Sequence, residues 1–282
     1  MTCVEGGFFN MGSNGDEVWR SDGEGPVRQV KLNSFFIDVL AVTNRQFKAF
    51  VQDTGHVTEA ERFGWSFVFV GFLRDKRRAS ASGISHPQST WWHAVRNSCW
   101  KRPTGSGSSI RKILDHPVVH VSWNDARAYA LWSGKRLLTE AEWEFAARGG
   151  LDGKLYPWGD ELTPEGRHQC NIWQGRFPDA NTKADGFFGT APADAFPPNH
   201  FGLYNMVGNV WEWCSDWWAT KFHADSVDRN PSGPPAGHEK VIRGGSYLCH
   251  HSYCNRYRNS ARTKNTPDSS TGNIGFRCGM DA

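Results

Sequence analysis

The pattern of apolar and polar positions predicts three short helices in the first half of the chain. Thr43 and Gln46 form a capping box, as do Thr139 and Glu142, because each pair can bond the first backbone N–H groups of a helix. A glycine lies just beyond each apolar segment and can end the helix there. The predicted helices cover residues 43–55, 122–134 and 139–148.

Short apolar runs predict strands elsewhere, and the second half of the chain is mostly loop. We expect strands at residues 29–32, 35–38, 118–121, 240–243 and 275–278. Because helices and strands do not alternate regularly, the fold class is α+β, in one domain over residues 1–282. The basic stretch 74–112, with nine Lys or Arg and one acid, is interpreted as a solvated surface insertion.

Composition narrows the fold and the function. The 282 residues include 30 Gly, 14 Trp and 18 Phe, which is typical of irregular segments held by large aromatic anchors. A net charge of +3 argues against nucleic acid as a partner. No apolar run approaches the roughly 20 residues that span a bilayer, so we expect no membrane insertion. Residues 1–5 have no basic segment leading into an apolar one, so we expect no signal peptide.

The candidate chemistry lies in Cys249 and Cys254, which four residues separate. The spacing differs from the C-x-x-C of redox helices, and no second C-x-x-C pair completes a zinc ribbon. Two thiolates alone suit a soft monovalent ion, and Cu(I) is the first candidate. A local disulfide, or two buried thiols, explains the spacing equally well.

Along almost its whole length the chain resembles the formylglycine-generating enzymes, also called sulfatase-modifying factors. Most of the matching motifs are common to the wider superfamily and indicate only the fold, whereas Cys249, Cys254, Ser246 and the last motif mark the catalytic branch. The motifs are residues 9–13, 116–125, 134–137, 139–144, 171–175, 202–213 and 265–270.

The resemblance implies a compact C-type-lectin-like domain with little regular secondary structure. It also implies a copper-dependent oxidase that uses molecular oxygen to convert a cysteine to Cα-formylglycine. The partner would be an unfolded or nascent sulfatase polypeptide carrying Cys-x-Pro-x-Arg. Cys249 and Cys254 would bind Cu(I), with Ser246 and Tyr253 orienting oxygen or substrate. The residues expected to line the peptide cleft are Trp100, Ser270 and Asn273.

Two structural calcium sites are implied by the same resemblance. Carboxylate, amide and backbone carbonyl oxygens are the ligands that Ca²⁺ takes, although Asn and Asp more often bond their own turns. The first site would use Asn171, Ile172, Asp185 and Phe187. The second would use Asn205, Gly208, Val210 and Glu212.

The chain departs from the secretory members of the family at two disulfides. One would join position 130 to Cys278 and the other position 147 to 259, but these positions hold Ala130, Ala147 and Asn259. Their loss fits a reducing cytosol, so we expect a prokaryotic, cytoplasmic and monomeric member. The remaining cysteines are expected to be buried structural thiols: Cys3, Cys99, Cys170 and Cys214.

Two other functions remain compatible with the sequence. The first is a non-catalytic binding or scaffold paralogue on the same fold, although such paralogues lack the cysteine pair. The second is a thiol–disulfide oxidoreductase that uses Cys249 and Cys254 without metal.

Overall fold

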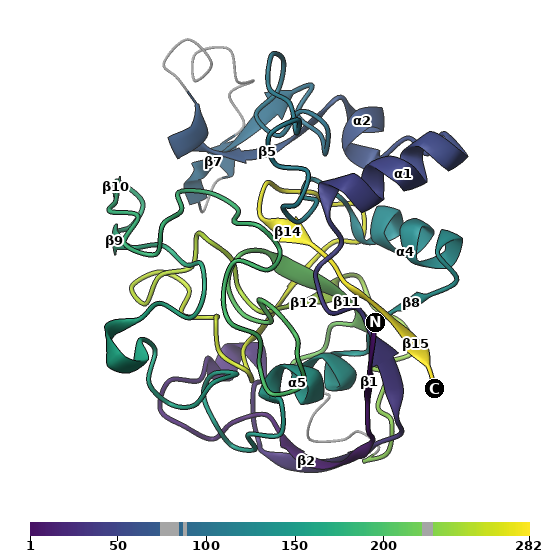
Figure 1. Ribbon diagram of the computed structural model, residues 1–282, viewed down its shortest axis with the longest axis vertical. Helices are drawn as coiled ribbons and strands as arrows, with labels where there is room; N and C mark the ends of the chain where they lie inside the picture. The colour runs from purple at the N-terminus through teal and green to yellow at the C-terminus, as the bar shows by residue number, and fades with distance from the viewer. Residues whose placement is uncertain (74–84, 87–88, 222–227) are drawn as a thin grey trace.

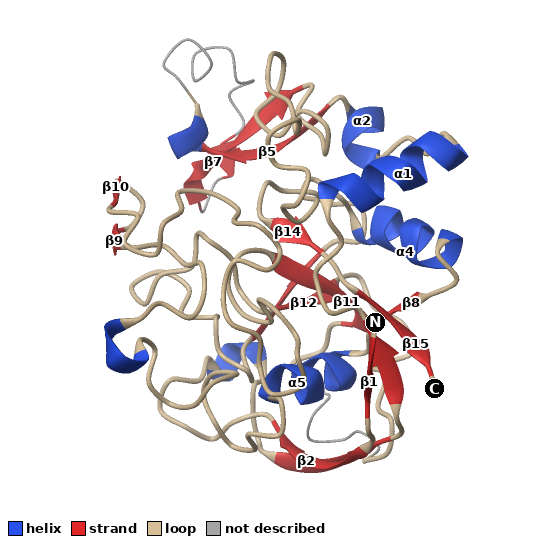
Figure 2. Cartoon of the chain, in the orientation of Figure 1, coloured by secondary structure: helices blue, strands red, loops and turns tan. Residues whose placement is uncertain are grey.

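The computed structural model describes residues 1–73, 85–86, 89–221 and 228–282. Over these residues, loops connect short helices and short strands, as Figures 1 and 2 show, which confirms an α+β chain with little regular structure. The helices are α1 (Asn44–Thr54), α2 (Glu59–Phe63), α4 (Trp123–Trp132) and α5 (Glu140–Arg148).

Capping boxes start all four of these helices, and the three helices predicted from the sequence are confirmed. In each, the side chain of a Ser or Thr accepts from the N3 backbone while the N3 side chain accepts from the cap backbone. Helix α2 follows the same rule at Thr58 and Glu61, but it is too short to show an apolar period. The sequence therefore does not predict it.

A four-stranded sheet crosses the centre of the molecule in the order β13-β12-β11-β14 (Figure 1). Strands β11 and β14 are parallel and the other pairs are antiparallel. The predicted strand at 240–243 is confirmed as β12. The four strands are β13 (Arg262–Asn265), β12 (Lys240–Arg243), β11 (Trp211–Trp217) and β14 (Ile274–Gly275).

A second sheet joins the two ends of the chain, because β4 pairs with both β1 and β15. Its order is β1-β4-β15-β8, with β1 (Thr2–Val4), β4 (Phe35–Ile37), β15 (Cys278–Asp281) and β8 (Arg136–Leu137). The single strand predicted at 275–278 is wrong in its bounds, since β14 and β15 belong to different sheets. The strand predicted at 118–121 is also wrong: Val118 and Val121 are buried, but their segment is irregular.

The remaining strands form a sheet in the order β5-β7-β6 and two ribbons, β2 with β3 and β9 with β10. Within the basic stretch, residues 74–84 and 87–88 lie outside the described part. The surface-insertion interpretation is wrong for β7, which pairs with β5 from Trp92 to Arg96 and buries Ala94 and Val95. These strands are β5 (Trp65–Phe69), β7 (Ser89–Arg96), β6 (Ser85–His86), β2 (Gly7–Met11), β3 (Arg28–Leu32), β9 (Gly175–Arg176) and β10 (Ala180–Asn181).

Buried arginines, each facing a carboxylate, reinforce the aromatic core. Arg243 contacts Glu140 and Glu144 at 3.0 and 2.6 Å, all three side chains being almost inaccessible to solvent. Paired burial of this kind keeps a charge from being stranded in the low-dielectric interior. In the described part of the chain, no helix combines the length and the apolar character needed to cross a membrane.

Candidate active site

The cysteine loop begins directly after β12, at a turn that only glycine can make. Gly244 and Gly245 have φ of 90° and 73°, in the left-handed region. A Cβ on Gly244 would lie 2.7 Å from the Met206 carbonyl oxygen, and one on Gly245 would lie 2.9 Å from the Arg256 carbonyl oxygen. The turn places Ser246 next to Cys249, whose backbone N–H donates to the Ser246 carbonyl at 2.8 Å.

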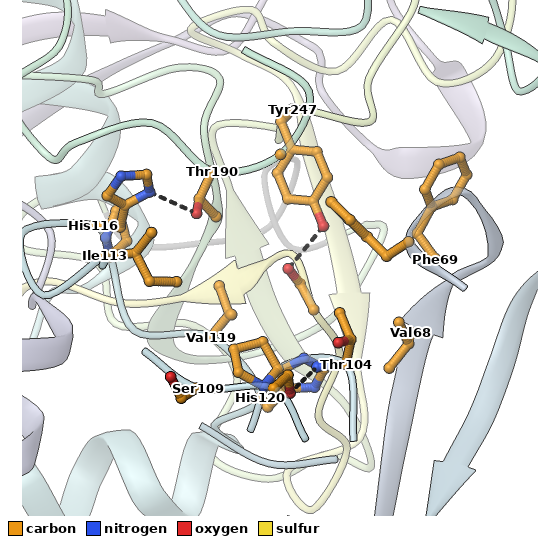
Figure 3. A pocket seen from close by; sticks show the side chains of 16 residues that line it. Val68, Phe69, Thr104, Ser109, Ile113, His116, Val119, His120, Thr190 and Tyr247 are labelled. Atoms are coloured by element: carbon orange, nitrogen blue, oxygen red, sulfur yellow. Dashed lines mark hydrogen bonds between the residues drawn. The ribbon is translucent and has the colours of Figure 1, made fainter. Parts of the chain in front are cut away.

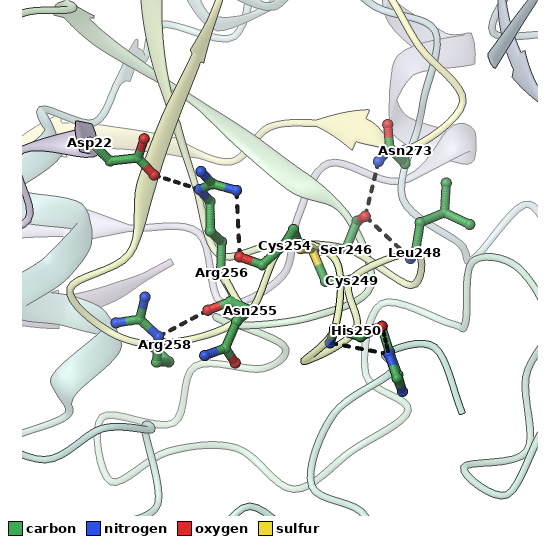
Figure 4. The surroundings of a disulfide bond; sticks show 11 residues. Asp22, Ser246, Leu248, Cys249, His250, Cys254, Asn255, Arg256, Arg258 and Asn273 are labelled. Carbon is green, nitrogen blue, oxygen red and sulfur yellow. Dashed lines mark hydrogen bonds and ion pairs between the residues drawn. A yellow bond between two sulfur atoms is a disulfide. The ribbon is translucent and has the colours of Figure 1, made fainter. Parts of the chain in front are cut away.

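Cys249 and Cys254 meet at the wall of a cavity (Figure 4). The structure joins their sulfurs in a disulfide with Cα atoms 5.6 Å apart, which is one of the alternatives that the spacing left open. Both side chains are buried. On reduction, the same backbone would hold two thiols side by side.

The cavity has a volume of about 180 Å³ and brings together most of the residues predicted for the catalytic site. Ser246, Tyr253 and Asn273 line it with the two cysteines. Asn265, from the last family motif, and Arg256, which follows the cysteine pair, also line it. Sequence reasoning missed the rest of the wall, because those residues come from segments far apart in the chain that only the tertiary fold brings together. The missed residues include Trp91, Trp92, Trp211, Thr263 and Thr271.

Tyr253 is held between two aromatic rings. Its ring stacks on Phe177 with centroids 4.6 Å apart and meets the edge of Trp91 at 4.8 Å. Burial raises the pKa of the Tyr253 phenol, so the group stays protonated at neutral pH and can donate a hydrogen bond.

Two of the three residues expected in the peptide cleft do not line this cavity. Trp100 is buried against Phe47, with ring centroids 5.4 Å apart, and its indole N–H donates to Glu61 at 3.3 Å. The Ser270 hydroxyl bonds the Ser66 hydroxyl at 2.8 Å. The tryptophans that line the cysteine cavity are Trp91, Trp92 and Trp211, and the cleft roles of Trp100 and Ser270 stay predictions.

A second cavity, of about 280 Å³, shares two chain segments with the first. Tyr247 and Gly272 line it (Figure 3), while their sequence neighbours Ser246 and Asn273 line the cysteine cavity. Its wall contains no Asp, Glu, Lys or Arg among the described residues. Its two histidines are His116 and His120; burial lowers the pKa of both, that of His120 to about 4, which favours their neutral forms.

The first predicted calcium group comes together around Asp185. Its carboxylate accepts from the backbone N–H groups of Ile172 and Phe187, both at 3.1 Å, and burial raises its pKa. The side-chain oxygen of Asn171 is buried without a hydrogen-bond partner, as a cation ligand would be. A buried oxygen without a hydrogen-bond partner costs free energy, and a cation bound to Asn171 Oδ1 would remove that cost.

The residues of the second predicted calcium site are less well arranged to bind a cation. The side-chain oxygen of Asn205 is also buried without a partner. Glu212, however, already accepts from the Trp143 indole at 2.8 Å and from the Arg277 guanidinium at 2.8–3.1 Å. To bind calcium the carboxylate would have to share these contacts. In the described residues no group of three His, Cys, Asp or Glu could hold a metal, so both sites would depend on amide and backbone oxygens.

The five remaining cysteines are free, as expected without the two disulfides. Cys99, Cys170 and Cys214 are buried as predicted, and burial raises the pKa of the Cys170 and Cys214 thiols. Cys3 is exposed on the short strand β1, so its predicted burial is wrong.

Known proteins match this chain over its full length. The family described as "Sulfatase-modifying factor enzyme 1-like domain" matches residues 1–282. The formylglycine-generating enzyme of Thermomonospora curvata is 57% identical over 100% of this chain and 93% of its own. That of Bos taurus is 52% identical over 100% of this chain and 74% of its own.

Two further relatives help to define the group. A Bos taurus protein named inactive C-alpha-formylglycine-generating enzyme 2 is 47% identical over 100% of this chain and 88% of its own. The solved structure of PvdO from Pseudomonas aeruginosa superposes with a TM-score of 0.72 at 26% identity, over 99% of this chain and 93% of that one. The chain therefore belongs to the family of sulfatase-modifying factor enzyme 1-like domains.

Proposed function

We propose that this protein is a formylglycine-generating enzyme that oxidises a cysteine of a sulfatase polypeptide with molecular oxygen at a Cu(I) site. The observation that carries the proposal is the pair Cys249 and Cys254, side by side in a cavity wall with Ser246, Tyr253 and Asn273. The likeness to proteins named for this activity, at 52–58% identity, supports it.

The donor set of the cavity fits copper. Two buried sulfurs face it, and its described wall contains no Asp, Glu or His that would select a harder cation. Cys249 and Cys254 would hold Cu(I) after reduction of the disulfide. When bound, the ion would supply a soft site for the substrate thiolate and the redox chemistry that activates molecular oxygen.

The residues of the chain bind and orient the client. Ser246 presents a hydroxyl that accepts from the Asn273 side chain at 2.9 Å, and Tyr253 presents a neutral phenol wedged between rings. Trp91 and Trp92 give the cavity an apolar aromatic wall that the client polypeptide would contact. When one small cavity holds the reacting groups together, a bimolecular encounter in dilute solution becomes an effectively unimolecular reaction.

The proposed conversion balances with an external thiol as electron donor. The Cβ–S bond of the client cysteine breaks and its sulfur leaves as hydrogen sulfide. One atom of molecular oxygen becomes the aldehyde oxygen, and the other leaves as water with two protons. Two electrons come from the added thiol. By the same proposal the client motif is Cys-x-Pro-x-Arg, the two calcium groups are structural, and the protein acts as a cytoplasmic monomer in a prokaryote.

The experiment is mass spectrometry of a Cys-x-Pro-x-Arg peptide incubated with reduced protein, Cu(I), dithiothreitol and air. Aldehyde from the wild type but from neither Cys249→Ala nor Cys254→Ala supports the proposal. If aldehyde still forms when copper is chelated, the reaction does not need copper, and only the oxidation of cysteine remains of the proposal.

A non-catalytic paralogue is the second candidate, because a relative named inactive is still 47% identical over the whole chain. Absence of aldehyde from folded, copper-loaded protein would favour it.

A further inference from the structure

We infer that Thr271 is a positioning residue: its hydroxyl fixes the orientation of the Asn273 amide, which makes Ser246 a dedicated hydrogen-bond donor toward the cysteine cavity. This inference rests on the proposed function for its catalytic meaning. Thr271, Asn273 and Ser246 all line that cavity.

The hydrogen bonds of these three side chains all run in the same direction, from Thr271 through Asn273 to Ser246. Thr271 Oγ1 donates to Asn273 Oδ1 at 2.6 Å, and Asn273 Nδ2 donates to Ser246 Oγ at 2.9 Å. Ser246 Oγ also accepts from the Leu248 backbone N–H at 3.3 Å. A hydroxyl oxygen has two lone pairs and one hydrogen, so with both lone pairs engaged Ser246 can only donate.

The direction of these hydrogen bonds depends on the Thr271 hydroxyl, because backbone hydrogen bonds hold the main chain of both Thr271 and Asn273 in place. The Thr271 carbonyl accepts from His120 N–H, and the Asn273 carbonyl accepts from Trp211 N–H, both at 2.9 Å. The Asn273 side chain is buried, so rotation of its amide is the freedom that remains. An amide turned by half a revolution would present Oδ1 to Ser246 and accept the serine hydrogen.

Ser246 and Cys249 are close neighbours, since Cys249 Sγ accepts the Ser246 backbone N–H at 3.4 Å. After reduction of the disulfide, a Ser246 hydroxyl that can only donate would stabilise a thiolate in the cavity, whether of Cys249 or of the client cysteine. Thr271→Val, which keeps the side-chain shape and removes the donor, would let the amide rotate and withdraw this hydrogen bond.

The test compares kcat and KM of aldehyde formation for the wild type, Thr271→Val, Thr271→Ala and Thr271→Ser. We expect Thr271→Val and Thr271→Ala to lose about tenfold or more in kcat with KM little changed, by analogy with supporting groups around metal sites. Thr271→Ser should restore kcat to within about twofold of the wild type. Thr54→Val is the matched control, because the Thr54 hydroxyl also donates to a nearby oxygen, the Phe50 carbonyl at 2.8 Å, but at the exposed end of α1 and away from the cysteine cavity.

A second measurement is independent of copper and activity. In protein labelled with ¹⁵N-asparagine, the Asn273 side-chain amide is identified by its absence in Asn273→Ala, and its exchange with solvent is measured. We expect faster exchange in Thr271→Val and Thr271→Ala than in the wild type, and protection restored in Thr271→Ser. Unchanged exchange would overturn the inference, as would unchanged kcat in an active enzyme. A wild type that forms no aldehyde would overturn the proposed function, while amide exchange would still decide the role of Thr271.

Discussion

The buried ion pair of Glu24 and Arg258 ties the end of the cysteine loop to the N-terminal segment. Arg258 Nη1 and Nη2 donate to the two Glu24 carboxylate oxygens at 2.7 and 2.8 Å, and the side chains of Arg258 and Glu24 are 1% and 0% exposed. Arg258 Nε also donates to the carbonyl of Asn255, the neighbour of Cys254, at 2.9 Å. Neutralising Glu24 should therefore weaken both the fold and the site.

The expected magnitude follows from burial. Glu24→Gln keeps the size of the side chain but leaves the Arg258 charge without its counter-ion, which costs about 3–5 kcal/mol for a buried pair. Because neither side chain reaches solvent, no screening reduces that figure. At about 2 °C per kcal/mol for a chain of this length, Tm should fall by about 6–10 °C.

The assay is thermal unfolding followed by circular dichroism at pH 7, with urea unfolding as a second measure. The control is Glu165→Gln, which removes the partner of Arg167 in a pair whose side chains are 76% and 75% exposed. That variant should stay within about 1 °C of the wild type. The double variant Glu24→Leu with Arg258→Met should recover much of the loss. A fall in Tm of less than about 2 °C in Glu24→Gln would show that buried Arg258 does not depend on the charge of Glu24.

Three further predictions concern pH, calcium and packing. Burial and the charge of Glu140 raise the pKa of Asp216 from 3.8 to about 7. Between these values the native chain keeps a proton that the unfolded chain releases, so this group lowers the free energy of unfolding as pH rises. The Tm of Asp216→Asn should accordingly gain on the wild type from about pH 5 to about pH 8, and a constant difference would contradict this. Calcium at about 100 times the Kd of a site should raise the wild-type Tm by about 5 °C for each site that it fills, since such binding contributes about 2.7 kcal/mol per site. Asp185→Asn should lose the share of the first site, and equal shifts in both proteins would remove Asp185 from that site. Lys240 lies 4.1 and 3.7 Å from the ring centroids of Trp123 and Trp217. Lys240→Met should cost about 1–2 kcal/mol in urea unfolding, whereas an unchanged midpoint would show that these contacts contribute nothing.

Local signals explain what the sequence could predict. A capping box needs two residues three apart, so two such boxes located α1 and α5, while Ser122 and the closing Gly134 located α4. The cysteine pair is equally local, and its chemistry could be read before the fold was known. Both features depend on neighbours along the chain rather than on distant segments.

Tertiary assembly explains what the sequence could not predict. Val118, Val119 and Val121 form a short apolar run typical of a strand, yet they are buried in an irregular segment. Trp100 and Trp91 are both tryptophans in the same stretch, but the fold packs Trp100 into the core and Trp91 against Phe177 and Tyr253 at the cavity. Thr271 gains its role only when the fold brings Asn273 to Ser246.

We propose that Cys249 and Cys254 form a catalytic copper centre, and this is tested by titrating reduced, metal-free protein with Cu(I) and measuring the rate of aldehyde formation at each step. We predict that the rate rises linearly to one copper per chain and then stays constant, and that neither Cys249→Ala nor Cys254→Ala responds. Full activity without copper, or in either variant, would contradict the claim.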